Sequence, residues 1–101
     1  MLMLISQDRL KAIPFSQIQF FVIMPECDTD GKFKLLAKSP TIENNFYDYL
    51  ILFKHEDIEI VKQVMQFLAK GKFLTPYNDD EKNIIIVDLP ELYKIGMKFR
   101  N

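Results

Sequence analysis

The sequence has little of what enzymes and metal proteins commonly use for chemistry. Among its 101 residues there are one cysteine, one histidine, three glycines and no tryptophan. A single cysteine cannot form a disulfide within the chain, so the fold requires no oxidising compartment. One cysteine and one histidine are too few ligands for a structural zinc ion, and three dispersed glycines form no phosphate-binding loop.

A strong charge of either sign is missing as well. Thirteen Lys and Arg residues nearly balance fourteen Asp and Glu residues, which leaves a net charge of −1. Nucleic-acid binders usually carry a strongly basic face, and peripheral membrane proteins carry a polybasic segment. The balanced charge therefore disfavours a nucleic acid or a membrane as the partner.

Long apolar runs are absent too. The longest uncharged stretch, residues 12–25, contains Ser16, Gln17 and Gln19, and it falls short of the roughly 18 apolar residues that suggest a membrane span. The apolar start, residues 1–5, lacks the basic region that opens a secretory signal. We therefore expect a cytoplasmic protein without a membrane span.

Apolar residues are what the chain does have, at 49% of its length. A chain of this size forms one domain and is long enough to bury a core. We predict a single α+β domain over residues 1–96, followed by a frayed C-terminal tail over residues 97–101.

Short runs of branched and aromatic residues, bounded by turn formers, predict strands. Pro14 confines one strand to a sheet edge, or itself to the end of a strand, because proline donates no hydrogen bond to a ladder. Gly31 supplies the positive φ of a hairpin turn over residues 26–31, and residues 39–45 and 73–82 read as loops. The expected strands cover residues 1–6, 11–15, 18–24, 32–38, 47–53 and 83–88.

One segment, residues 57–70, has the apolar spacing of an amphipathic helix. Asp57 is a suitable N-cap, and Gly71 stands where a helix commonly ends in a glycine. Pro90 can open a short helical turn over residues 90–93. The apolar stripe of the long helix consists of Ile58, Val61, Val64, Met65 and Leu68.

Apolar residues occupy both faces of several predicted strands, because side chains alternate between the two faces along a strand. One helix can cover only one face of a sheet, so the other face requires curvature, loops or a partner. We expect a curved antiparallel sheet or partial barrel of about five to six short strands, with the helix 57–70 packed on one face.

The uncovered face is our candidate interaction surface. Exposed apolar patches of that size are uncommon on monomers. We therefore expect the protein to bind itself, as a homodimer, or another protein. The residues assigned to this surface are Phe21, Ile23, Tyr49, Ile51 and Phe53.

Two constellations could carry chemistry, and both have a simpler interpretation. Asp28-Thr29-Asp30-Gly31 resembles the opening of a calcium loop, but the glycine comes too early and Ser39 stands where the closing glutamate belongs. A hairpin turn explains the same residues. Cys27 and His55 are the only Cys–His pair, and nothing in the sequence brings them together for catalysis. We predict no catalytic residues, no cofactor and no metal site, and so no enzyme.

Aromatic residues on strands near several lysines leave one alternative open. Such a face can stack the bases of a single-stranded nucleic acid or hold a small ligand, although aromatic residues in strands are ordinarily part of a core. The residues concerned are Phe20, Phe21, Phe33, Tyr47, Tyr49 and Phe53, with Lys32, Lys34, Lys38 and Lys54 near them.

Several segments along the chain follow one pattern, which begins with a Ser-Gln-Asp step after a first strand. These segments are Ile5-Ser6-Gln7-Asp8-Arg9, Ile13-Pro14-Phe15, the hairpin over residues 18–38, Leu50–Phe53, residues 61–68 and Val87-Asp88-Leu89-Pro90-Glu91. In this pattern the chain resembles a family of small β-rich proteins from Gram-positive bacteria and their phages and mobile elements. The sequence departs from the family at Pro14, at Asp57 and in its longer C-terminal end.

This resemblance implies a β-then-helix order and leaves the function open, because the family offers no activity or catalytic set to carry over. The missing catalytic set of this chain and the apolar residues on both faces of its strands lead us to expect a non-enzymatic protein-interaction module, an accessory product of a bacterial or phage genome.

Overall fold

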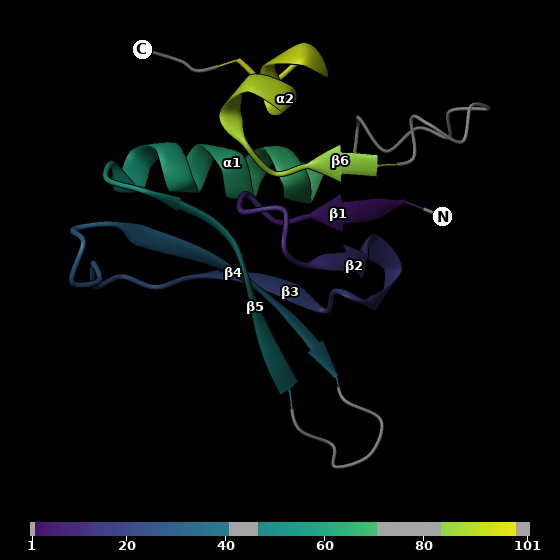
Figure 1. Cartoon of the computed structure of the whole chain (residues 1–101), viewed down its shortest axis with the longest axis horizontal. Helices are drawn as coiled ribbons and strands as arrows, with labels where there is room; N and C mark the ends of the chain where they lie inside the picture. Colours follow the sequence, from purple (N-terminus) through teal and green to yellow (C-terminus); the bar gives the residue numbers. More distant parts are fainter. Residues whose placement is uncertain (1, 41–46, 71–83, 99–101) are drawn as a thin grey trace.

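The computed structural model describes residues 2–40, 47–70 and 84–98 (Figure 1). These residues form strands and helices in an α+β arrangement, as predicted. In chain order the elements are β1 (Met3–Ile5), β2 (Ala12–Pro14), the 3-10 helix η1 (Phe15–Gln17), β3 (Phe20–Ile23), β4 (Phe33–Pro40), β5 (Tyr47–His55), α1 (Ile58–Lys70), β6 (Ile84–Ile86) and α2 (Leu89–Lys94).

The strands form two open sheets of three strands each, in the orders β2-β1-β6 and β3-β4-β5. The expectation of one curved sheet or partial barrel is therefore wrong. The β3-β4-β5 sheet is antiparallel throughout, whereas β6 joins β1 in parallel. A parallel pair needs a long crossover connection, and α1 lies within the chain that separates β1 from β6. In Figure 1 the β2-β1-β6 sheet lies to the right, with β6 level with α1, and the β3-β4-β5 sheet lies below α1.

Several local predictions are confirmed. β2 is an edge strand and ends at Pro14, as the missing proline N–H requires. The long helix begins at Ile58, where Asp57 Oδ1 accepts a hydrogen bond from the N–H of Glu59 at 2.9 Å. Val61, Val64 and Leu68 are its buried residues. The proposed glycine end at Gly71 lies outside the described residues.

The C-terminal segment is more ordered than the sequence suggests. The short turn predicted over residues 90–93 is the helix α2, whose N-cap Asp88 accepts a hydrogen bond from the N–H of Glu91 at 3.0 Å. Met97, predicted to open a frayed tail, is only 3% exposed and packs in the core. Residues 99–101, the rest of that tail, lie outside the described part of the chain.

Of the two predicted loops, residues 73–82 lie entirely outside the described part of the chain. The loop expected over residues 39–45 starts later than predicted, because β4 continues through Pro40. Residues 41–45 lie outside the described ranges.

A β-bulge in β5 changes which side chains face the core. Leu35 pairs with Phe53 and Leu36 with Ile51, so Leu52 is an extra residue in β5. Leu52 and Phe53 are both fully buried and both belong to the core cluster. Phe53 is therefore misplaced in the predicted interaction surface, because strict alternation ends at the bulge.

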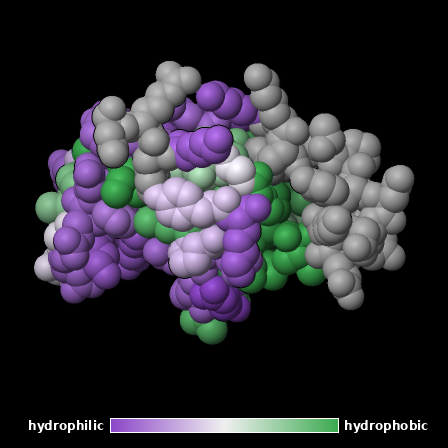
Figure 2. Space-filling view, turned by 90° about the horizontal axis from the view of Figure 1, so that it is seen from above, coloured by the Kyte–Doolittle hydropathy of each residue, from purple (hydrophilic) through white to green (hydrophobic). Residues whose placement is uncertain are grey.

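Seen from above, hydrophilic side chains predominate towards the left of the molecule, and hydrophobic ones gather towards its centre and right (Figure 2). Within the described residues, neither helix combines the length and apolar character that spanning a membrane requires.

Candidate functional site

The β3-β4-β5 sheet has one face covered by α1 and one face that no described helix covers. The register places Phe20, Lys38 and Tyr49 in one cross-strand row. The next row of that face consists of Val22, Leu36 and Ile51. We call the surface formed by these two rows the open face.

The opposite face carries the core. Residues that alternate with the open face, such as Phe21, Ala37 and Leu50, belong to the core cluster or pack against it. α1 lies against all three strands of this sheet. Because opposite faces of a strand take alternate residues, the rows of the open face point away from α1.

The central row of the open face is aliphatic across all three strands. Leu36 is only 7% exposed, yet it lies outside the core cluster. Its cover therefore comes from neighbours on the open face, where Val22 and Ile51 flank it and are themselves half-buried. Apolar surface that remains accessible on a sheet face is a recurrent feature of contact sites.

The second row is aromatic, with a lysine at its centre. Lys38 Nζ lies 5.0 Å from the ring centroid of Phe20 and 4.2 Å from that of Tyr49. Both distances allow cation–π attraction. The two rings are 46% and 52% exposed, so this row presents large apolar side chains to the surroundings.

Further lysines flank the aliphatic row at the end nearer the β3–β4 turn. Lys34 pairs directly with Lys54 across β4 and β5. Lys54 Nζ also lies 3.4 Å from Asp28 Oδ2 in that turn. The pKa of Asp28 lies below its ordinary value, chiefly because its carboxylate accepts a hydrogen bond from the N–H of Lys32, with a smaller contribution from Lys54.

The structure divides the five residues predicted for the interaction surface. Tyr49 and Ile51 lie on the open face. Phe21 and Ile23 pack against the core, and Phe53 is fully buried in it. The sequence could not show which apolar face α1 would cover, because both faces of β3 carry comparable side chains. For this reason the sequence does not single out Val22 and Leu36, and it assigns Phe20 only to the alternative aromatic face.

The Ser-Gln-Asp step serves the architecture. Ser6 is buried, and its hydroxyl donates a hydrogen bond to Asp8 Oδ1 at 2.6 Å and accepts one from the N–H of Lys11. The bond from Ser6 is the main reason that the pKa of Asp8 lies below its ordinary value. These bonds hold the turn between β1 and β2.

The same turn connects three parts of the molecule. The Gln7 N–H donates to the carbonyl of Leu52 at 2.8 Å, and Gln7 Oε1 accepts from the N–H of Lys54 at 2.9 Å. Arg9 forms an ion pair with Asp88, the N-cap of α2. Gln7 thus ties the bulged edge of β5 to the other sheet, and Arg9 ties the turn to α2.

Asp28 and His55, two of the residues considered for chemistry, have structural partners. Asp28 Oδ1 accepts hydrogen bonds from the N–H groups of Asp30 and Lys32, and Gly31 adopts a φ of 75°, as a hairpin turn requires. Cys27 is an exposed free thiol. His55 Nδ1 accepts a hydrogen bond from the N–H of Asp57. Within the described residues, no three His, Cys, Asp or Glu side chains form a group that could hold a metal ion.

Comparison with models of protein families, with curated proteins and with solved structures finds no match to this chain.

Proposed function

We propose that the protein is a non-enzymatic interaction module that docks another protein on its open face. The observation that carries the proposal is the aliphatic row of Val22, Leu36 and Ile51, which lies across three strands on the side away from α1. An accessory role in a bacterial or phage genome is compatible with such a module.

The composition of the open face fits a protein surface. Its aliphatic row lies between the aromatic row, which has Lys38 at its centre, and the pair of Lys34 and Lys54 at the margin. Interfaces between proteins commonly have an apolar centre and a polar rim, with aromatic residues enriched. Tyr49 has the amphipathic ring that often anchors such contacts.

The aromatic row supports a second candidate, a single-stranded nucleic acid stacked on Phe20 and Tyr49. Stacking on exposed rings next to a lysine is a known mode of binding. Two features favour a protein instead. Lys38 already lies over both rings, and the adjacent row is aliphatic and offers no stacking surface.

Site-specific photo-crosslinking in cells tests the proposal. The photoreactive amino acid p-benzoylphenylalanine replaces Tyr49 on the open face or Tyr93 on α2, a matched tyrosine that is 46% exposed. We expect a defined cross-linked protein from position 49 and none of that mass from position 93. Adding Ile51→Lys, which places a charge in the aliphatic row, should remove the product.

Three other outcomes would count against the proposal. Identical products from both positions would show that the contact is not specific to the open face. Products that contain only this chain would make a second copy the occupant of that face. Products that disappear with nuclease treatment, together with a melting temperature raised by a single-stranded oligonucleotide and not in Tyr49→Ala, would favour the nucleic-acid candidate.

A further inference from the structure

A second feature of the same sheet is its edge at β3, with which no other strand of the described residues pairs. Exposed sheet edges invite pairing with another strand, and proteins usually protect them with charges, prolines or bulges. β2 carries Pro14 at its edge, and β5 carries the bulge and the two hydrogen bonds of Gln7. β3 consists of Phe20, Phe21, Val22 and Ile23, with neither a charge nor a proline among them.

The backbone of β3 presents hydrogen-bonding groups on its outer side. The N–H of Met24 donates to the carbonyl of Lys34, so in this antiparallel ladder residues 24, 22 and 20 direct their backbone groups towards β4. The N–H and C=O groups of Phe21 and Ile23 therefore point away from β4, to the edge of the sheet. These two N–H and two C=O groups have the spacing that pairing with another extended strand requires.

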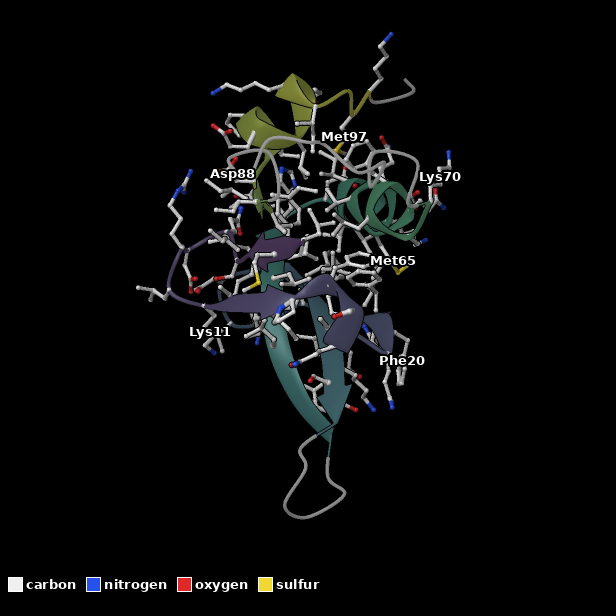
Figure 3. All side chains as sticks on the ribbon, turned by 90° about the vertical axis from the view of Figure 1, so that its right-hand side faces the viewer. Lys11, Phe20, Met65, Lys70, Asp88 and Met97 are labelled. Carbon is white, nitrogen blue, oxygen red and sulfur yellow. The ribbon has the colours of Figure 1, made fainter. Side chains whose placement is uncertain are left out.

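A hollow of about 390 Å³ lies beside this edge. It is lined by Phe20 and Phe21, whose side chains belong to opposite faces, so it opens where the two faces meet. Met65 and Ala69 of α1 line its other wall. Figure 3 shows Phe20, Met65 and Lys70 along the same side of the molecule.

We infer that two copies of this chain pair through their β3 strands in antiparallel fashion and form one continuous six-stranded sheet. A two-fold axis at Val22 brings Phe21 of each copy opposite Ile23 of the other, so the four edge-facing backbone groups bond reciprocally. The occupant of the edge is thus a second copy of the same strand.

The side chains near the edge are self-complementary under this symmetry. In the register centred on Val22, Met24 of one copy lies opposite Phe20 of the other, beside the hollow. Met24 and Phe20 both lie on the open face and are 42% and 46% exposed, so their apolar side chains would cover each other. On the side of α1, Ile23 of one copy lies opposite Phe21 of the other, whose side chain lines the hollow.

The dimer would also enlarge the open face. Residues directly opposite each other in a strand pair place their side chains on the same side of the sheet. The two open faces would therefore join into one surface. Pairing at the edge does not depend on whether the open face binds another protein, and the two proposals can fail separately.

The mass of the isolated chain in solution tests this inference. Sedimentation equilibrium at micromolar concentration should give twice the chain mass of 12.0 kDa. Val22→Lys places two lysines at the two-fold axis and should give a single-chain mass. Ile51→Lys is the matched control, because it lies in the same row on the opposite edge strand, and it should remain a dimer.

Several results would overturn the inference. These are a single-chain mass for the native protein at every concentration, or loss of the dimer in Ile51→Lys. If Val22→Lys no longer melts cooperatively, its mass does not report on the dimer, and hydrogen exchange of the native protein tests the dimer instead. The amides of Phe21 and Ile23 should exchange faster on dilution, while that of Val22, bonded within the ladder, stays constant. Exchange of all three amides that does not depend on concentration would contradict the dimer.

Discussion

The two faces of the β3-β4-β5 sheet carry similar residue types, but their side chains differ in how deeply they are buried. Beneath α1, Leu35, Ala37 and Leu52 are fully buried. On the open face, Val22 and Ile51 remain half-buried, and Tyr49 is 52% exposed. The difference arises from the single long helix, which covers one face and leaves the other. The exposure of an apolar strand residue therefore depends on its partner element more than on its own hydrophobicity.

Two neighbouring residues of β5 give the most direct test of this contrast. Leu52→Ala removes a fully buried side chain and should lower the free energy of unfolding by about 2–5 kcal/mol, through lost burial and the cavity that remains. Ile51→Ala, on the open face, should cost about 1 kcal/mol or less, because a half-buried site leaves no closed cavity. Denaturant unfolding of both variants measures the two values.

A comparable loss in the two variants would contradict the assignment of faces. It would mean that Ile51 is buried in solution as deeply as Leu52, for example beneath a second copy. Repeating the Ile51→Ala measurement over a range of protein concentrations separates that case, because stability gained from association depends on concentration.

Local features of this fold could be predicted from the sequence, and pairings between distant segments could not. Pro14 indicated an edge strand, and the spacing of Val61, Val64 and Leu68 indicated α1; both follow from interactions within a few residues. The parallel pairing of β1 with β6 and the division into two sheets depend on contacts between remote segments. No periodicity reports those contacts.

The candidate site shows the same limit at the level of single residues. From Tyr49 to Phe53 every residue is aromatic or aliphatic, so the segment has no charged residue that marks one face. The bulge at Leu52 then turns Phe53 towards the core, whereas alternation predicts the opposite. A continuous apolar run predicts a strand, and it gives no signal for a bulge within it.

The hydrogen bonds of Gln7 at the β5 edge of the sheet allow a second test. Gln7→Ala removes the side-chain oxygen that accepts the hydrogen bond from the N–H of Lys54. We expect a loss of about 1 kcal/mol in the free energy of unfolding, together with faster hydrogen exchange of the Lys54 amide. Gln7→Glu keeps an acceptor oxygen at this position and is the matched control. Unchanged exchange at Lys54 in Gln7→Ala would show that the protection of the β5 edge has another source.

The smallest expected effect is a loss of stability at acid pH. It arises at Asp28, beside the lysines that border the open face. The pKa of Asp28 lies below its ordinary value of 3.8, chiefly because the N–H of Lys32 donates to the carboxylate. A lowered pKa in the folded state adds stability that is present above pH 3.8 and is lost as the pH falls through the lower folded value. The melting temperature of the native protein should therefore fall in that range, and less steeply in Asp28→Asn.

The control, Asp30→Asn, removes the same charge from the same turn and spares both hydrogen bonds to Asp28 Oδ1. An equally steep fall in Asp28→Asn would mean that these bonds do not contribute to the acid sensitivity, and that the turn is held by Gly31 and the backbone alone.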